Sequence, residues 1–345
     1  MSTLRFPELG FYTLAGAPKS PRDMLEELVH AEQLGLGAAF ISERFNIKEA
    51  GALTGAAVAV TNSINIVTAA TNHTTRHPLV SASWASTLHI LSEGRFSLGL
   101  GRGIEAMFNA YGMPLATTES LEAFALLMRR LWNGETVFNY SDLTGTYPVL
   151  RLDPDFALNI PLSITAFGPR TLEMAGRAYD NVILHTFFTD ETTARAVQTV
   201  KRSAEQSGRD PSTVKVWSCF ATVGDHIAAD LRLKKTVGRL ATYLQAYGDL
   251  MVRTNKWDPA VLQRFRNDEF VKGFGGAIDA KGTTQDLERI ATLIPPEWLA
   301  AAATGSAQQC VAAIENQFAL GCDGVIMHGA TPTELEPIVT AYAAN

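Results

Sequence analysis

The most constraining feature of this sequence is an alternation, repeated along the whole chain, of short apolar runs with longer segments of helical periodicity. This pattern is typical of an α/β protein with a parallel sheet. Eight helically connected strands favour a (β/α)8 TIM barrel, although periodicity alone leaves a doubly wound open sheet as the alternative. The strand candidates are residues 9–15, 38–42, 64–70, 95–101, 160–166, 180–186, 214–223 and 323–329.

Two stretches interrupt the alternation and are interpreted as insertions. The first lies near 104–158, where a helix up to Trp132 precedes a β-like segment near 136–152. The second lies near 250–300, where Pro and Gly residues break up the pattern. Because barrels with insertions reach this length as one unit, we predict a single domain over residues 1–345.

Composition narrows the classes of partner. The formal net charge of -6 comes without a basic cluster, so nucleic acid is not expected. No apolar stretch is long enough for a membrane span, and the first residues lack a signal-peptide pattern, so we expect a cytoplasmic protein. The cysteines Cys219, Cys310 and Cys322 show no metal-like or CxxC spacing, which agrees with a reducing compartment.

Polar residues follow several apolar strands directly. In barrels the chemistry lies at the carboxyl ends of the strands, so these residues are site candidates, whereas ordinary surface loops would explain about half of them. The candidates are Glu43 and Arg44 after the second strand, Asn72 and His73 after the third, and Gly101 and Arg102 after the fourth.

A candidate anion site follows the fifth strand. Gly168 permits close backbone approach, Pro169 opens a helix, and the free amides of the first turn lie next to Arg170 and Thr171. A phosphate fits such a site. The alternative is a plain helix start with a surface arginine.

Three blocks of the sequence resemble the bacterial luciferase-like family of flavin and deazaflavin oxidoreductases. They are TRHPLVSASWASTLHILSEGRFSLGLGRG (75–103), AFGPRTLEMAGRAYDNVIL (166–184) and GSAQQCVAAIENQFALGCDGVIM (305–327). The resemblance implies a barrel, usually a homodimer, that binds FMN or coenzyme F420, and the sequence is more similar to the F420-dependent branch.

This resemblance implies an F420-dependent oxidoreductase that transfers a hydride between C5 of the deazaflavin and an unidentified small organic substrate. The alternatives are an FMN-dependent monooxygenase and a flavin-binding or deazaflavin-binding protein without turnover. The phosphate of the cofactor would bind at residues 168–171. Ala69 and Ala70 would support the ring through a bulge that often contains a cis peptide, with Asn72 and His73 beside it; without the resemblance, two small residues equally relieve crowding inside a barrel.

One position departs from the family pattern. Deazaflavin enzymes of this group often carry an acid–His pair after the second strand, where this chain has Glu43 and Arg44. An arginine is too basic to exchange protons near neutrality, so Arg44 is expected to orient an anionic substrate or a cofactor hydroxyl. The available acid/base residues are Glu43, His73 and His328, and we predict Glu43 and His73 as catalytic.

Two further motifs are weak. His73 and His77 have a metal-like spacing, but no carboxylate motif completes it and Pro78 places the pair across a loop–helix junction, so no metal site is predicted. The GLGRG segment at 99–103 is an incomplete dinucleotide-binding loop.

Overall fold

The computed structural model describes residues 5–15, 18 and 20–345. Its main sheet is parallel and closes on itself, because β9 pairs with both β8 and β11. This closure confirms the TIM barrel and excludes the open sheet. The barrel strands are β1 (Phe6–Tyr12), β2 (Leu36–Ile41), β3 (Asn65–Thr68), β4 (Phe96–Leu100), β7 (Leu162–Thr165), β8 (Asn181–Ile183), β9 (Lys215–Gly224) and β11 (Gly324–His328).

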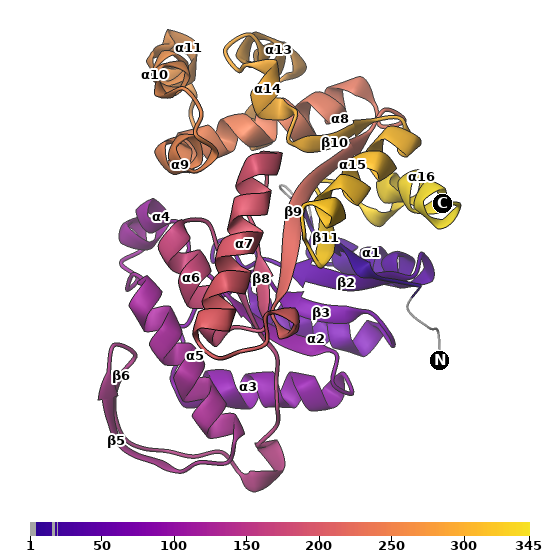
Figure 1. Cartoon of the computed structure of the whole chain (residues 1–345). Helices are drawn as coiled ribbons and strands as arrows, with labels where there is room; N and C mark the ends of the chain where they lie inside the picture. The colour runs from indigo at the N-terminus through magenta and orange to yellow at the C-terminus, as the bar shows by residue number, and fades with distance from the viewer. Residues whose placement is uncertain (1–4, 16–17, 19) are drawn as a thin grey trace.

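Helices surround this barrel in the order of its strands (Figure 1). Several begin where the sequence supplies a start signal: Pro78 opens α3, Pro169 opens α6, and Ser306 caps α15 through the amide of Gln309. The surrounding helices are α1 (Asp23–Gln33), α2 (Ala50–Val60), α3 (Pro78–Leu91), α4 (Glu105–Ala110), α5 (Thr118–Trp132), α6 (Pro169–Ala178), α7 (Asp190–Gln206), α15 (Ala307–Ala319) and α16 (Pro332–Ala343).

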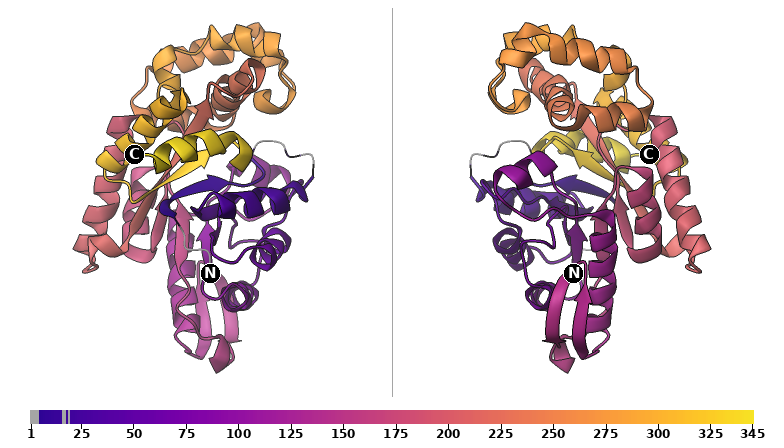
Figure 2. Two further views of the ribbon diagram at one scale, coloured as in Figure 1. Left: turned by 90° about the vertical axis from the view of Figure 1, so that its right-hand side faces the viewer. Right: turned by 90° about the vertical axis from the view of Figure 1, so that its left-hand side faces the viewer.

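The two irregular stretches form structures at opposite ends of the molecule (Figure 2). An antiparallel hairpin of β5 (Val137–Asp142) and β6 (Gly145–Leu150) follows α5, and a helical layer with its own apolar cluster lies between β9 and α15. Strand β10 (Ala302–Gly305) then adds to β9 outside the closed barrel. The layer contains α8 (Ala229–Leu233), the π-helical segment Lys234–Gly238, α9 (Arg239–Asn255), α10 (Pro259–Asn267), α11 (Glu269–Gly273), α12 (Ile278–Lys281), α13 (Thr284–Ala291) and α14 (Pro296–Leu299).

The barrel interior is narrow and filled by a small apolar cluster that includes Phe40, Val67 and Ile326. Polar residues follow where the strands end. This apolar cluster therefore closes the barrel interior below the space at the carboxyl ends of the strands. Among the barrel strands, β1 differs most from its predicted bounds, since it begins and ends three residues earlier than residues 9–15. The helical layer begins at Ala229, well before the insertion predicted near 250–300. Among the described residues, no helix has the combination of length and apolarity that crossing a bilayer requires.

Candidate functional site

A cavity of about 1130 Å³ opens at the carboxyl ends of the barrel strands. Its walls come from the residues after β1, β2, β3, β4, β7 and β8, from β9 and β11, and from α9 in the helical layer. The volume exceeds that of a usual small-molecule site, about 300–1,000 Å³. There is therefore room for a large cofactor and a substrate together.

Ala69 and Ala70 both line this cavity, and the peptide bond between them is cis. The segment lies where the resemblance places it, at the end of β3. Gly101 does not line the cavity but supports this segment from behind: a Cβ on Gly101 would lie 2.9 Å from the Cβ of Ala70 and 2.6 Å from Thr165 Oγ1. Its predicted contact with a cofactor is therefore replaced by a packing role.

The start of α6 forms a second part of the cavity wall. Gly168, Pro169, Arg170 and Thr171 all line the cavity, and a Cβ on Gly168 would meet nothing within 4 Å. The open space beside the first helical turn suits an anion, since the amides there and the helix dipole favour negative charge. The Arg170 guanidinium is exposed and pairs with Glu119.

Arg102 lies beside this turn in the cavity wall, where its Nε donates a hydrogen bond of 3.2 Å to the carbonyl oxygen of Ala116. That bond holds the head of the side chain at the wall. Arg102 thus lines the cavity, and its role in cofactor binding stays a prediction.

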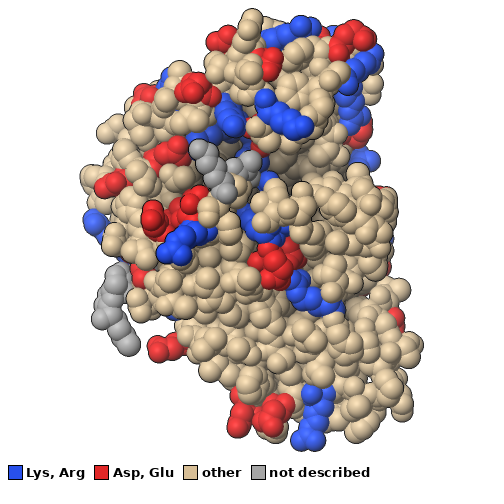
Figure 3. All heavy atoms as spheres, turned by 180° about the vertical axis from the view of Figure 1, so that it is seen from behind, with Lys and Arg blue, Asp and Glu red and all other residues tan. Residues whose placement is uncertain are grey.

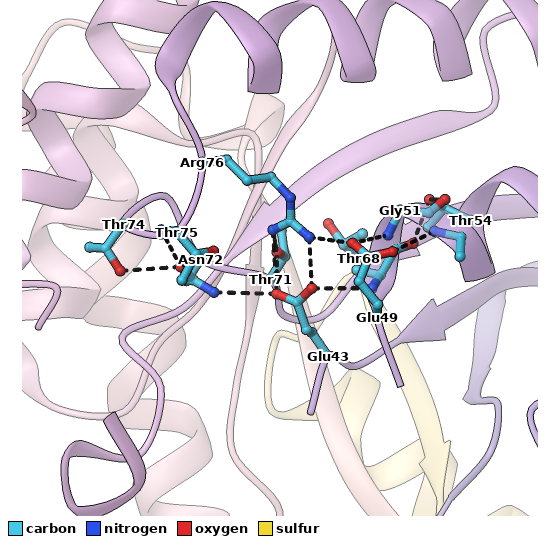
Figure 4. Close-up of polar contacts among 12 residues, drawn as sticks. Glu43, Glu49, Gly51, Thr54, Thr68, Thr71, Asn72, Thr74, Thr75 and Arg76 are labelled. Atoms are coloured by element: carbon cyan, nitrogen blue, oxygen red, sulfur yellow. Dashed lines mark hydrogen bonds and ion pairs between the residues drawn. The ribbon is translucent and has the colours of Figure 1, made fainter. Parts of the chain in front are cut away.

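Glu43 has a structural environment, contrary to its predicted catalytic position. Its side chain is 2% exposed, lies outside the cavity lining and pairs with Arg76 at 2.8 Å. It also accepts hydrogen bonds from Thr71 Oγ1 at 2.7 Å, Asn72 Nδ2 at 3.2 Å and the Ala50 amide at 3.2 Å (Figure 4). The carboxylate thus joins the end of β2 to the start of α2 and to the loop before α3.

His73 and Asn72 also lie outside the cavity lining. The His73 ring is buried 5.2 Å from the Phe124 ring, centroid to centroid, and burial lowers its pKa to about 4. Asn72 accepts the Thr75 amide at 3.0 Å and so shapes its own loop. The loop after β3 places the His73 ring against Phe124 of α5 and the Asn72 side chain against Glu43 and Thr75. Neither side chain therefore lines the described cavity.

One part of the cavity wall is a polar cluster, defined as Tyr12, Arg44, His185, Arg239, Tyr243, Tyr247 and His328. Ring contacts connect its members: Tyr12 and His328 have ring centroids 5.3 Å apart, and His185 and Tyr243 have theirs 4.9 Å apart. Arg44 belongs to this cluster, so the residue that replaces the expected histidine does face the cavity.

The two histidines of the polar cluster are electrically neutral near pH 7, because burial lowers the pKa of both, that of His185 to about 4 and that of His328 well below 6.5. His185 Nδ1 lies 2.8 Å from the Thr186 carbonyl oxygen, which can only accept a hydrogen bond, so Nδ1 carries the proton. The Nε2 atom therefore accepts from the Tyr247 hydroxyl at 2.9 Å. His328 Nδ1 has no hydrogen-bond partner among the described residues.

Charge is distributed unevenly around the cavity. Of the described residues that line it, seven are Lys or Arg and one, Glu105, is acidic, although the chain as a whole carries a net charge of -6. Such a concentration of positive charge favours anionic ligands. The cationic residues are Arg44, Arg102, Arg170, Arg195, Arg239, Arg253 and Lys256.

Comparison with known families agrees with this arrangement. Residues 6–324 match the family described as luciferase-like monooxygenase. The chain belongs to this family. Within it, the chain is 30% identical over 256 residues to 5,10-methylenetetrahydromethanopterin reductase from Methanolobus tindarius, a match that covers 70% of this chain and 74% of the relative.

Two further relatives carry the name of a cofactor. An F420-dependent hydroxymycolic acid dehydrogenase from Mycobacterium tuberculosis is 33% identical over 161 residues, which covers 44% of this chain and 43% of that protein. The solved structure of coenzyme F420-dependent tetrahydromethanopterin reductase from Methanopyrus kandleri superposes with a TM-score of 0.81 at 19% identity, covering 98% of both chains. At that identity the superposition shows the shared luciferase-like fold.

Sequence patterns did not single out several cavity residues of this luciferase-like barrel, among them Arg239, Tyr243 and Tyr247. These three lie on α9, which belongs to the inserted helical layer and not to a strand end. Their spacing of four residues places them on one face of the helix, a signal that the sequence does contain. His185 and His328 were visible at strand ends, but only the fold shows that they face the same cavity as α9.

Proposed function

We propose that the protein is an F420-dependent oxidoreductase that transfers a hydride between C5 of the deazaflavin and a small organic substrate. The observation that carries this proposal is that one large cavity contains both the Ala69–Ala70 segment and the start of α6. Small side chains let the backbone approach a flat ring, and the helix start suits the phosphate of the same molecule. When bound, the deazaflavin supplies the carbon that accepts or donates the hydride.

The choice of F420 over FMN is supported by the relatives. One at 33% identity is named for its dependence on F420, and the likeness to the methanopterin reductase covers most of both chains. The cationic lining gives physical support, because F420 carries several carboxylates on its tail in addition to its phosphate, whereas FMN carries only the phosphate. An FMN-dependent monooxygenase remains the alternative in this family.

Within this function the residues of the polar cluster take the place of the expected acid/base pair. Of the replacements considered from sequence, Glu43, His73 and His328, only His328 lines the cavity. We assign to His328 the exchange of a proton with the substrate oxygen or nitrogen, since its Nδ1 has no partner among the described residues. Arg44 and Arg239 supply fixed positive charge.

Titration of the purified protein with both cofactors tests the cofactor assignment. We expect F420 to bind at least tenfold more tightly than FMN, a difference of about 1.4 kcal/mol. Gly168→Leu should weaken F420 binding by about tenfold or more, because the side chain would occupy the space beside the anion site.

The matched control is Gly275→Leu, since a Cβ there also meets nothing within 4 Å and the residue lies outside the cavity lining. It should leave the affinity unchanged. Equal or tighter binding of FMN would refute the cofactor choice, and equal effects of the two variants would refute the location of the site.

We also propose that the protein forms a homodimer. Helix α3, helix α5 and the β5–β6 hairpin expose large apolar side chains, among them Leu91 at 63%, Leu126 at 56% and Phe138 at 68%. Figure 3 shows few charged side chains over the lower part of one face, the height at which these elements lie in Figure 1.

We also propose that the protein is cytoplasmic. The described cysteines are buried and free, which supports this placement.

A further inference from the structure

The polar cluster holds two arginines, Arg44 and Arg239, in the wall of the cavity. We propose that the substrate is a small organic anion, and that Arg239 and Arg44 hold its carboxylate. This inference rests on the proposed function, which it narrows to a class of substrate. It is carried by the fixed geometry of Arg239 and by the imbalance of charge around it.

Arg239 is held in place before any ligand arrives. Its side chain is 9% exposed, and one terminal nitrogen contacts Asp279 at 2.9 Å. Asp279 is itself fixed, because Thr242 Oγ1 donates to its carboxylate at 3.0 Å and accepts from its amide at 2.9 Å. The guanidinium carbon lies 5.9 Å from the centre of the Tyr243 ring. An arginine oriented in this way loses little rotamer freedom when it binds a planar carboxylate.

One donor of Arg239 is left over. Its Nε has no hydrogen-bond partner among the described residues, although the atom is buried within the wall of the cavity. A buried donor without a partner is unfavourable, so an acceptor that reaches it is favoured. A carboxylate is the acceptor that matches a guanidinium in shape and charge.

A second cation increases the positive charge at this place. Burial lowers the pKa of Arg44, and the neighbouring positive charge of Arg239 lowers it further. Lys48 adds a third positive charge behind Arg44, and its pKa is lowered to about 8 by burial and by Arg44. Asp279 and Glu27 offset this charge in part. An anion between the two arginines would relieve their mutual repulsion.

The other members of the polar cluster contribute hydrogen bonds but no opposing charge. Burial lowers the pKa of His185 and His328 and raises that of Tyr12, Tyr243 and Tyr247, so all five are neutral near pH 7. An anionic substrate therefore meets no carboxylate among the side chains of this cluster. A carboxylate would add a second counter-charge to Arg239, which already pairs with Asp279.

Benzoate and benzamide make a suitable pair of probes, because they share shape and differ in charge. Calorimetric titration should show benzoate binding at least about tenfold more tightly than benzamide, both to the free protein and to the protein saturated with F420. Arg239→Gln and Arg44→Gln should each reduce benzoate affinity by about tenfold or more and change benzamide affinity less than about threefold. Two variants are used because Arg239→Gln also removes the partner of Asp279.

The control is Arg130→Gln, which removes an equal charge from a surface pair with Glu135 outside the cavity. Its benzoate affinity should match that of the wild type. The inference is overturned if benzoate and benzamide bind alike, if neither binds, or if F420 abolishes benzoate binding, which would assign the arginines to the cofactor. Failure to bind F420 together with intact, arginine-dependent benzoate binding would instead refute the proposed function and leave the anion site standing.

Discussion

Replacement of Glu43 by Gln tests whether the Glu43 carboxylate has a structural role or a catalytic one. The carboxylate accepts hydrogen bonds from four partners, one of which is the Arg76 guanidinium (Figure 4). The exposed fraction is 2% for the Glu43 side chain and 18% for that of Arg76. Removal of one partner of a buried ion pair costs about 3–5 kcal/mol, because the remaining charge stays buried without compensation. Glu43→Gln should therefore lower the free energy of unfolding substantially.

The surroundings place the expected loss near the lower end of that range. Arg76 also pairs with Glu49, so its charge keeps one counter-ion when Glu43 becomes neutral. The glutamine retains a carbonyl oxygen that can accept from Thr71 or from the Ala50 amide. We expect a loss of about 3 kcal/mol, measured from the urea dependence of unfolding.

Glu49→Gln is the matched control, because it removes an equal charge from the same arginine at a site that is 55% exposed. An exposed pair contributes about 0–1 kcal/mol, and glutamine keeps one of the two oxygens that cap α2. Both variants should transfer hydride at the wild-type rate per folded molecule in single-turnover experiments. A Glu43→Gln protein with wild-type stability and a rate reduced by about 10²-fold would refute the structural assignment and restore Glu43 as an acid/base residue.

Two further predictions concern the proton and the assembly. His328→Gln should slow substrate oxidation by about 10²-fold. In the wild type, kcat/KM should stay level from pH 8 down through 6.5 and fall only at lower pH, because burial holds the pKa of His328 well below 6.5. A midpoint near 6.5, or an unaffected variant, would contradict the role. The double variant Leu91→Glu with Phe138→Glu should sediment as a monomer, whereas the wild type should sediment as a dimer. The control is Leu231→Glu, which changes an exposed leucine of α8 and should also sediment as a dimer. Unchanged sedimentation of the double variant would contradict the proposed interface.

The barrel could be predicted from sequence because its signal is local and repeated. Each strand is a short apolar run, and several following helices begin with residues whose chemistry marks a helix start, as Pro78 and Pro169 do. The start of α6 was predictable for the same reason, since Gly168 and Pro169 are neighbours in the chain. The position of a helix start can be predicted from neighbouring residues alone, without information on distant segments.

The direction of a side chain at a strand end could not be predicted in this way. Glu43 and Arg44 are adjacent, yet the first points to Arg76 and away from the cavity while the second lines it. Which of two neighbours faces the cavity depends on a partner that lies 33 positions further along the chain. His73 was misplaced for the same reason, because the core position beside Phe124 becomes available only when α5 packs against α3.

The presence of Arg44 after β2, where many relatives are expected to carry a histidine, has consequences for the rest of the site. A guanidinium stays charged at any pH that an enzyme meets, so Arg44 can hold an anion but cannot take the proton that accompanies hydride transfer. That task requires a group that is neutral and in contact with the same space, and His328 at the end of β11 meets both conditions. The positive charges of Arg44 and Arg239 are also among the causes that lower the His328 pKa. The residues that favour an anionic substrate therefore also keep the imidazole unprotonated, and a bound carboxylate, by offsetting their charge, would raise its basicity when the substrate is in place.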